Sequence, residues 1–332
     1  MQAMVLRRPR PIEEGPLEYT QVPTPTPKKG EVRLRIAACG ICHTDLHTIE
    51  GELAGGKLPI IPGHQIVGTV DALGEGVTRF RPGDRVGVPW LYSTCGKCEF
   101  CLRGQENLCE NARFTGHSVD GGYAQYVVAP QEFTYLMPEG YPDTQAAPLL
   151  CAGVIGYRAL RLSEARPGCR LGLYGFGASA HIVIQIALYR GCEVYVYTRS
   201  PGHQQLARRL GAAWVGRAEE GGPGELDSAI IFAPAGGLVP QALRALRKGG
   251  TLALAGIYMT PLPSMPYDLL YEERTLRSVA NSTRQDVVEL LETAPQVPIS
   301  TEVQLFPLQE ANRALQLLKE GGIDGAGVLE VP

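Results

Sequence analysis

Four of the nine cysteines of this chain lie in one short segment, "CGKCEFCLRGQENLC". Two residues separate each of the first three cysteines, so a single tight loop can turn three sulfurs toward one point, and the fourth follows shortly after. Two explanations compete: a disulfide framework, which suits an oxidising compartment, and a metal site, which suits a reducing one. The four residues are Cys95, Cys98, Cys101 and Cys109.

The rest of the sequence favours the metal. The N-terminal "MQAMVLRRPRPIEEGPLEYT" lacks the apolar stretch of a secretory signal, and the chain has no run of roughly 18 apolar residues that would span a bilayer. We therefore expect a cytoplasmic protein with no membrane partner. Clustered thiols in a reducing compartment bind metal or do redox chemistry more often than they form structural disulfides.

Four thiolates in a tetrahedral array suit Zn²⁺, which accepts four sulfurs at about 2.3 Å in a structural site with no open position. An iron-sulfur cluster also takes four thiolates, and four unrelated buried cysteines remain an alternative. A closed zinc site holds a loop but catalyses nothing. The function of the chain must therefore be sought in other residues.

Composition points to small-molecule chemistry. Of the 332 residues 44% are hydrophobic and 20% are charged, which is ordinary for a globular protein large enough for two domains. The formal net charge is −3 and the isoelectric point is near 6.1. This charge gives no electrostatic reason to expect nucleic acid or an anionic membrane as a partner.

The apolar pattern changes along the chain. Up to residue 147, short apolar runs broken by Gly, Pro and Asp predict a β-rich domain. The second region, 148–281, begins within a helical stretch predicted over 146–160. After this stretch, strand-like runs alternate with helical runs such as 178–191 and 237–250. This alternation indicates βαβ units and a Rossmann-type parallel sheet. Residues 282–332 do not continue the alternation, and we expect them to pack back on the first domain. The predicted fold class is therefore α/β.

A second group of metal-binding side chains lies in "CGICHTDLHTIEG" and "IPGHQIVG", with one more cysteine, Cys151, at the junction of the two domains. Taken alone, each of these residues is weak evidence for a metal site, because a single cysteine or histidine is more often a buried or surface residue with no catalytic or metal-binding role.

Together these segments resemble the zinc-dependent medium-chain alcohol dehydrogenases, over essentially the whole chain. "GICHTDLH" and "PGHQIVG" match the catalytic-zinc positions, the cysteine cluster at 95–109 matches the structural-zinc lobe, and "YGFGASAH" matches the dinucleotide turn. "VPWLYSTC" and "SVANSTRQD" are similar to the yeast-like bacterial members. The resemblance implies a GroES-like catalytic domain, a Rossmann domain and two zinc ions per chain.

By this resemblance Cys42, His64 and Cys151 are the ligands of a catalytic zinc, and Asp45 orients His64. Two sulfurs, one imidazole and an open position match what zinc needs to act as a Lewis acid. The implied reaction is the interconversion of alcohols with aldehydes or ketones by hydride transfer to or from a nicotinamide cofactor.

The family also implies a proton relay, in which Thr44 accepts the substrate proton and His47 passes it toward solvent. One residue departs from the family pattern: Gln65 stands where an acidic residue usually follows the ligand histidine. We hypothesise that Gln65 leaves the zinc more electrophilic and slows ligand exchange.

The dinucleotide turn has Gly175 and Gly177 after an apolar strand and Ala180 where a third glycine often stands, before a helical run. A strand before and a helix after provide the backbone N–H groups that hold a pyrophosphate. The resemblance implies that His43 contacts the same pyrophosphate. An arginine that relatives place near the C-terminus is absent, because Ala326 occupies its position.

Cofactor choice is expected at the end of the next strand, where an acidic side chain would bind the ribose hydroxyls of NAD. Here stand Thr198, Arg199 and Ser200. With no carboxylate to repel a phosphate and a guanidinium to pair with one, NADP(H) is favoured over NAD(H). The alternative is that Arg199 stacks on adenine or faces solvent while NAD(H) binds without an acidic clamp.

The resemblance places Trp90 and Leu91 at the wall of the substrate pocket, with Phe114 and His117 near the same cavity. A bulky indole there narrows the cleft toward small primary alcohols, whereas the alternative is a tryptophan buried in the lobe. The three remaining cysteines are interpreted as buried or incidental: Cys39, Cys169 and Cys192.

The sequence leaves two alternative functions open. One is a polyol or amino-alcohol dehydrogenase of the same superfamily, although Cys151 as third ligand favours the simple-alcohol branch. The other is a non-catalytic nucleotide-binding protein held together by zinc, which predicts loss of the catalytic ligands. Relatives form dimers or tetramers, and we expect a homo-oligomer, with the tetramer favoured.

Overall fold

The structure is a computed structural model that describes residues 1–297 and 299–332. The chain divides into two compact units, each with its own hydrophobic core. The first unit contains 1–151, 282–295 and 301–332, and the second contains 152–281 and 296–300. The division between the units thus follows Cys151, so all three predicted ligands of the catalytic zinc belong to the first unit.

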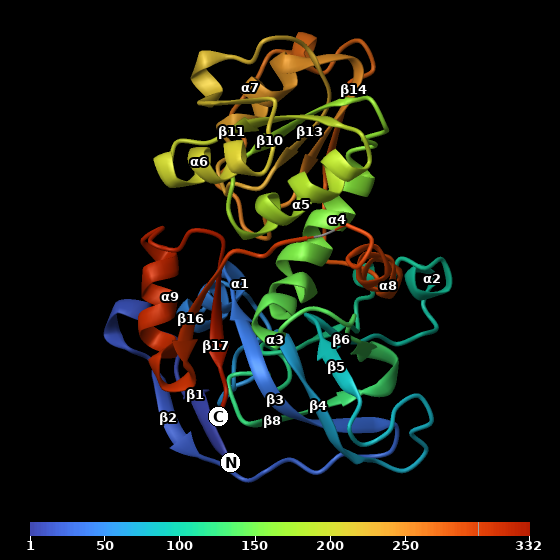
Figure 1. The fold of residues 1–332 in the computed structure, drawn as a ribbon, viewed down its shortest axis with the longest axis vertical. Helices are drawn as coiled ribbons and strands as arrows, with labels where there is room; N and C mark the ends of the chain where they lie inside the picture. Colours follow the sequence, from blue (N-terminus) through green and yellow to red (C-terminus); the bar gives the residue numbers. More distant parts are fainter. Residues whose placement is uncertain (298) are drawn as a thin grey trace. The chain divides into compact units, whose positions relative to one another are not determined.

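A seven-stranded sheet organises the first unit, in the order β16-β17-β3-β4-β5-β9 with β8 also paired to β3. Figure 1 shows β3, β4 and β5 side by side. In β3, buried and more exposed residues alternate over the first half of the strand, as expected for a strand with one face on a core. The sheet strands are β3 (Glu31–Ile41), β4 (Gln65–Leu73), β5 (Arg85–Val88), β8 (Tyr126–Pro130), β9 (Tyr135–Leu136), β16 (Val303–Pro307) and β17 (Ala326–Glu330).

Two small sheets and short helices complete this unit. The small sheets pair β1 (Gln2–Leu6) with β2 (Leu17–Gln21) and β6 (Leu91–Ser93) with β7 (Arg113–Phe114). The α-helices are α1 (His43–Glu50), α2 (Glu99–Leu102), α3 (Asp143–Ala146), α8 (Arg284–Thr293) and α9 (Ala311–Lys319). The 3₁₀ turns are η1 (Ile12–Glu14), η2 (Glu106–Leu108), η3 (Gln131–Phe133), η4 (Ala147–Leu150) and η7 (Leu308–Glu310).

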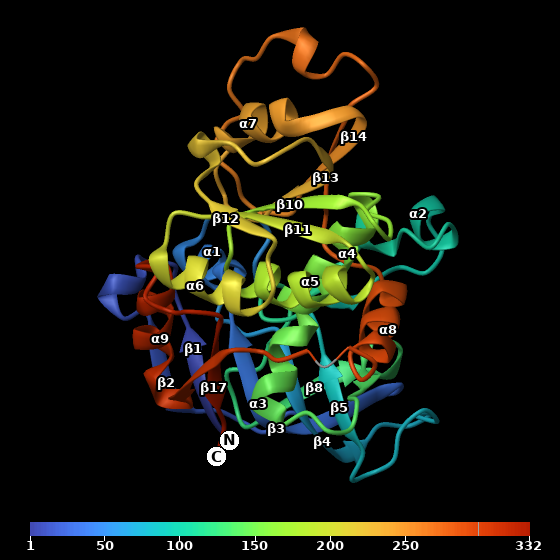
Figure 2. The same cartoon turned by 45° about the horizontal axis from the view of Figure 1, so that its top comes forward.

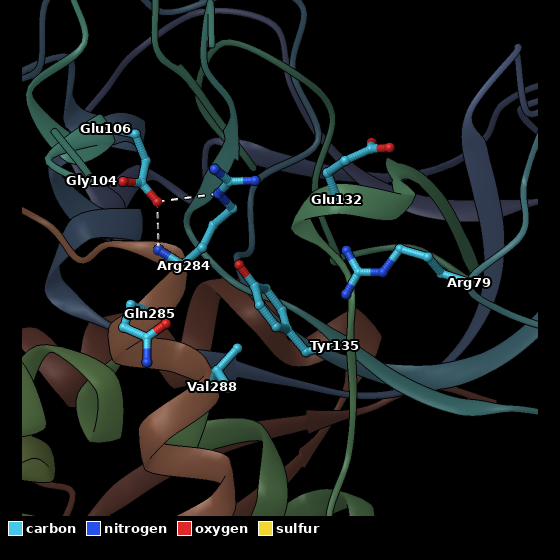
Figure 3. A pocket seen from close by; sticks show the side chains of 8 residues that line it. All are labelled: Arg79, Gly104, Glu106, Glu132, Tyr135, Arg284, Gln285 and Val288. Carbon is cyan, nitrogen blue, oxygen red and sulfur yellow. Dashed lines mark hydrogen bonds and ion pairs between the residues drawn. The ribbon is translucent and has the colours of Figure 1, made fainter. Parts of the chain in front are cut away.

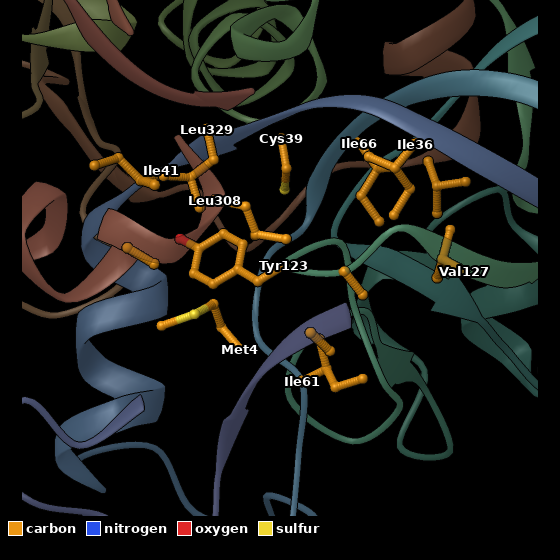
Figure 4. Packing of buried hydrophobic residues seen from close by; sticks show 14 of the residues in the cluster. Met4, Ile36, Cys39, Ile41, Ile61, Ile66, Tyr123, Val127, Leu308 and Leu329 are labelled. Carbon is orange, nitrogen blue, oxygen red and sulfur yellow. The ribbon is translucent and has the colours of Figure 1, made fainter. Parts of the chain in front are cut away.

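The C-terminal segment is part of the first unit's core. Strand β17 pairs antiparallel with β3, with Gly327 opposite Ile41. Figure 4 shows Leu308 and Leu329 packed around the ring of Tyr123 together with Met4 from the first strand. Residues from both ends of the chain therefore bury apolar surface in one core, which ties the end of the chain to the domain that carries the metal ligands.

The second unit is a parallel six-stranded sheet in the order β12-β11-β10-β13-β14-β15. Figure 2 shows α5 and α6 on one face of this sheet and α7 on the other. Helices on both faces of a parallel sheet confirm the predicted α/β class with a Rossmann-type domain. The strands are β10 (Arg170–Tyr174), β11 (Glu193–Tyr197), β12 (Trp214–Gly216), β13 (Leu226–Ile231), β14 (Leu246–Leu254) and β15 (Thr275–Ser278). The helices and 3₁₀ turns are α4 (Ala152–Leu162), α5 (Ala178–Tyr189), α6 (Pro201–Arg209), α7 (Leu238–Ala245), η5 (Ala218–Glu220) and η6 (Tyr267–Leu269).

Two predicted helices end differently from expectation. The helical stretch predicted over 146–160 is broken at Cys151, because its backbone, at φ −135° and ψ −69°, is not helical; the 3₁₀ turn η4 ends there and α4 begins at Ala152. The helix predicted over 237–250 ends at Ala245, because Leu246 is extended and pairs with Leu226 as the first residue of β14. At Leu246 strand pairing thus overrides helical periodicity.

Candidate functional site

Three metal-binding side chains meet in the first unit. Cys42 follows β3 and caps α1, His64 directly precedes β4, and Cys151 lies between η4 and α4. The Cys42 Sγ atom is 3.4 Å from His64 Nε2 and 3.9 Å from Cys151 Sγ. The sulfur and nitrogen atoms of all three residues lie within 4.8 Å of one another.

These separations fit zinc. A tetrahedral zinc with Zn–S near 2.3 Å and Zn–N near 2.0 Å places two sulfurs about 3.8 Å apart and a sulfur and a nitrogen about 3.5 Å apart. The three donors are two thiols and one imidazole, which is the ligand set of a catalytic zinc with a fourth position for substrate. The residues present therefore fit the metal that the sequence predicted.

The carboxylate of Asp45 organises this cluster. Its Oδ1 accepts hydrogen bonds from His64 Nδ1 (2.9 Å) and from the backbone N–H of Gly63 (3.2 Å), and its Oδ2 accepts one from the backbone N–H of Cys42 (2.9 Å). The bond to Nδ1 leaves Nε2 of His64 to face the sulfurs. Asp45 is only 1% exposed, so water does not compete for these bonds.

Electrostatics around the cluster favour an ion pair when no metal is bound. Burial alone lowers the pKa of His64, but the Asp45 carboxylate and Cys42 outweigh burial and raise that pKa to about 10. The hydrogen bond from Cys151 and the charge of His64 lower the pKa of Cys42, while the same bond and burial raise the pKa of Cys151. Zinc binding must therefore displace protons from His64 and Cys151.

The proposed proton relay lies in α1. Thr44 is buried in the first turn, and its backbone N–H donates to Cys42 Sγ at 3.2 Å. Nδ1 of His47 contacts the carboxylate of Glu52. The sequence prediction missed Glu52. The helix α1 ends in a Schellman turn, in which Gly51 has φ +80° and the Glu52 N–H donates to the His47 carbonyl. This turn brings Glu52 back beside His47.

Aromatic rings cover one side of the cluster. The Trp90 ring meets the His64 ring edge-on at 4.9 Å between centroids and stacks on Phe114 at 5.1 Å. His117 lies 5.9 Å from Trp90 and donates from Nε2 to the carbonyl of Ala54 at 3.1 Å. Leu91 is buried in β6 beside them. Trp90 is partly exposed and touches a predicted metal ligand, which suits a pocket wall.

The four clustered cysteines form a second group of donors around α2. Sγ of Cys101 lies 3.9 Å from that of Cys95 and 3.4 Å from that of Cys98, and all four sulfurs lie within 4.8 Å of one another. Backbone N–H groups of Lys97 and Cys98 point at Cys95 and lower its pKa to about 6. Among the described residues none of these cysteines forms a disulfide. Four sulfurs at these spacings fit a closed tetrahedral zinc site.

A cavity of about 330 Å³ lies beside this lobe, away from the Cys42 cluster. Figure 3 shows Glu106 and Arg284 at its edge, where Oε1 of Glu106 accepts bonds from the backbone N–H (2.9 Å) and Nε (3.2 Å) of Arg284. This pair links the lobe to the start of α8. None of the residues that line the cavity belongs to either group of possible metal ligands.

The dinucleotide turn lies in the second unit, between β10 and α5. Gly175 has φ +87°, and a Cβ there would come within 2.8 Å of the Ala233 nitrogen, so only glycine fits. A Cβ on Gly177 would meet nothing within 4 Å, which leaves open space beside the N-terminus of α5. Ala180 is fully buried. Strand order reverses between β10 and β13, the point where open parallel sheets bind nucleotides.

The residues predicted to select the cofactor lie directly after β11, at the start of α6. Thr198 is buried, Arg199 is exposed, and Ser200 caps α6 by accepting a hydrogen bond from the His203 N–H at 3.4 Å. The first turn of α6 has no acidic residue. In the first unit, His43 is exposed at the start of α1, and Ala326 is buried at the start of β17.

Known proteins share this architecture. The family profile "Alcohol dehydrogenase GroES-like domain" matches residues 28–139, and "Zinc-binding dehydrogenase" matches 180–295. A probable alcohol dehydrogenase of Mycobacterium tuberculosis is 47% identical over 99% of this chain and 97% of its own length. An alcohol dehydrogenase of Geobacillus stearothermophilus is 38% identical over 95% of this chain and 96% of its own.

The chain belongs to the zinc-dependent medium-chain alcohol dehydrogenases. Solved structures agree: a cinnamyl alcohol dehydrogenase of Sorghum bicolor superposes with a TM-score of 0.90 at 28% identity, over 99% of this chain and 97% of that chain. A CAD of Helicobacter pylori complexed with NADP(H) gives 0.89 at 25% identity, with the same coverage of each chain. The predicted family, the GroES-like and Rossmann domains and the alcohol dehydrogenase function are thereby confirmed. No helix among the described residues is long and apolar enough to cross a membrane.

Metal analysis of this alcohol dehydrogenase should find two zinc ions per chain. Cys98→Ser removes one of four sulfurs in the lobe, so we expect one zinc to remain and the lobe to unfold at lower temperature. Elemental analysis and thermal unfolding check both effects. Leu102→Ala, in the same lobe at a side chain that is 75% exposed, is the matched control and should keep both zinc ions. Two zinc ions in Cys98→Ser would contradict the lobe assignment.

Proposed function

We propose that this enzyme binds a catalytic zinc through Cys42, His64 and Cys151 and interconverts small alcohols with aldehydes or ketones, with NADP(H) as the preferred cofactor. The observation that carries the proposal is the convergence of two sulfurs and one imidazole nitrogen at zinc-ligand spacing beside a buried, hydrogen-bonded carboxylate. When bound there, zinc supplies Lewis-acid polarisation of the substrate oxygen.

The chain's own residues position the ligands and move the proton. Asp45 holds His64 in the tautomer whose Nε2 faces the sulfurs, and the Thr44 N–H bonds the sulfur of Cys42. The Thr44 hydroxyl accepts the proton of the substrate alcohol, and His47 takes it on toward solvent. Glu52 faces Nδ1 of His47 and stabilises the charge that the imidazole gains.

The aromatic side chains beside the predicted metal ligands limit the size of the substrate. Trp90 lies against His64 and is held in place by stacking on Phe114. A rigid indole next to the metal leaves little room for branched or bulky groups, so we propose that short primary alcohols and their aldehydes are the preferred substrates. His117 lies 5.9 Å from Trp90, and Leu91 pairs with Phe114 across β6 and β7, so both belong to the same aromatic lobe.

The preference for NADP(H) rests on the segment after β11. Arg199 is exposed, Ser200 caps α6, and the first turn of α6 carries no carboxylate. A 2′-phosphate finds a guanidinium and the N-terminus of a helix there and meets no negative charge. Gly175, Gly177 and Ala180 provide the turn for the pyrophosphate. By family resemblance we also propose His43 as a cofactor-binding residue.

We also propose a cytoplasmic homo-oligomer, with a tetramer favoured over a dimer. None of the nine cysteines, all of which the structure describes, forms a disulfide, which suits a reducing compartment. In the second unit, β15 is the edge strand of the sheet, and large apolar side chains near it are exposed, a pattern typical of protein contact surfaces. These side chains are Ile257, Tyr258, Leu262, Tyr267 and Tyr271.

Initial rates of aldehyde reduction with NADPH and NADH, over a short aldehyde series, test the function and the cofactor together. We expect turnover with both and a higher kcat/KM with NADPH. Arg199→Ala should lower kcat/KM for NADPH by roughly 10- to 100-fold, because a charged hydrogen bond to phosphate is lost, and leave NADH almost unchanged. Arg208→Ala, at the far end of α6, is the matched control. A wild-type kcat/KM that is more than tenfold higher with NADH than with NADPH would contradict the proposed preference for NADP(H).

Replacing Glu52 tests the proton relay. Glu52→Gln removes the carboxylate that faces His47, so we expect kcat for alcohol oxidation to fall by roughly 3- to 10-fold, because the contact that orients the His47 ring in the relay is weakened. Zinc content should stay at the wild-type value, and the solvent isotope effect on kcat should rise. Glu52→Asp should recover part of the rate. An unchanged kcat and isotope effect in Glu52→Gln would show that Glu52 only closes the turn after α1.

Gln65→Glu tests the unusual residue beside His64. Gln65 is buried at the start of β4, and its side chain packs over Gly40. A carboxylate at this position places negative charge near the metal, which makes ionisation of the substrate hydroxyl harder. We therefore expect the rising limb of kcat for alcohol oxidation to move to higher pH and ligand exchange to accelerate. An unchanged turnover together with an unchanged pH profile would contradict the hypothesis.

A further inference from the structure

Cys169 and Cys192 form a close thiol pair in the second unit, outside both zinc clusters. Cys169 directly precedes β10, and Cys192 directly precedes β11. Their Sγ atoms are 3.4 Å apart, and the two residues are only 9% and 6% exposed. Neither belongs to a group of three or more possible metal ligands among the described residues, so the pair is separate from both predicted zinc sites.

Backbone hydrogen bonds hold the two cysteines opposite each other. The N–H of Gly168 donates to the Gly191 carbonyl at 2.9 Å, and the N–H of Glu193 donates to the Cys169 carbonyl at 2.8 Å. These bonds bracket the pair at the start of the β10 and β11 ladder. Neighbouring strands lie about 4.8 Å apart, within the range of about 4.4–6.8 Å that a disulfide allows between Cα atoms. Rotation of the side chains is therefore enough to bring the sulfurs to bonding distance.

We propose that Cys169 and Cys192 are a modification site at which peroxide forms a reversible intramolecular disulfide, and that this bond covalently closes the β10-α5-β11 unit. In the first step the Cys169 thiolate attacks one oxygen of hydrogen peroxide. The O–O bond breaks, a sulfenic acid forms, and the leaving hydroxide takes a proton to become water. In the second step the Cys192 sulfur attacks the Cys169 sulfur, the S–O bond breaks, and a second water leaves with the Cys192 proton. The two thiols lose two electrons, and the peroxide gains them.

The local environment supports Cys169 as the attacking thiol. The hydrogen-bonding contact between the two sulfurs lowers the pKa of Cys169 to about 7, against the opposing effect of burial, while the same contact raises the pKa of Cys192. Cys192 thus remains a thiol close to the sulfur that peroxide oxidises, which is the arrangement of a resolving cysteine.

The disulfide would act on stability rather than on cofactor binding. Cys169 lies at the beginning of β10, whereas the Gly175 turn follows its end, about 17 Å away along five strand residues. A cross-link at the beginning restricts the unfolded chain over residues 169–192 without touching the turn. We therefore expect the oxidised enzyme to bind its cofactor as before and to unfold at a temperature higher by roughly 3–10 °C.

Peptide mapping of the full-length, zinc-loaded enzyme tests the proposal. Trypsin should release peptides 162–170 and 191–199, each with one cysteine, since it does not cleave between Arg166 and Pro167. After treatment with hydrogen peroxide in small molar excess and alkylation of remaining thiols, we expect the two peptides linked, with the summed mass less two hydrogen atoms. Dithiothreitol should separate them. Bound zinc is measured in the same sample, which shows whether the ligand thiols were oxidised.

Two variants sharpen the interpretation. In Cys192→Ala, peroxide should leave Cys169 as a sulfenic acid that dimedone traps, and the rise in unfolding temperature should disappear. Cys169→Ala should show neither the sulfenic acid nor the rise. Peptides 162–170 and 191–199 that are both fully alkylated after peroxide treatment of the wild-type enzyme would overturn the proposal. So would oxidation that releases zinc before any link between the two peptides appears.

Discussion

The carboxylate of Asp45 is the contact on which the metal centre depends. One oxygen binds His64 Nδ1 and the Gly63 backbone, and the other binds the backbone of Cys42, so a single buried side chain fixes two ligands that come from different strand ends. Because Asp45 also completes the capping box of α1, the helix carrying the relay begins where the ligands need it. The hydrogen bond to Asp45 that caps α1 is thus one of those that position the metal ligands.

Features that depend on residues close together in the sequence could be predicted. The cysteine spacing at 95–109 and the glycines around Gly175 are short-range patterns with one physical explanation each, and the structure brings the cysteine sulfurs together. The alternation of strand-like and helical runs predicts the parallel sheet, because strands buried on both faces are apolar along their whole length. His64 and Cys151 were assigned from family resemblance, since their approach to Cys42 depends on the whole first unit.

Features that depend on register or on a turn could not be predicted. Glu52 reaches His47 only because Gly51 adopts a left-handed conformation, and periodicity carries no such information. Cys169 and Cys192 are buried, as one of the two sequence interpretations has it, but their mutual contact could not be predicted, because it follows from the register of β10 against β11 rather than from their spacing. The helix before β14 ended early for the same reason, since pairing with Leu226 pulls Leu246 into the sheet.

Anomalous diffraction at the zinc edge from crystals of the full chain tests the central claim most directly. The account predicts a peak enclosed by Cys42 Sγ, His64 Nε2 and Cys151 Sγ, at about 2.0–2.3 Å from each, in addition to a peak within the cysteine lobe. A single peak confined to the lobe, with His64 bonded to Asp45 but no zinc beside it, would contradict the claim that the Asp45-anchored cluster is the catalytic metal site.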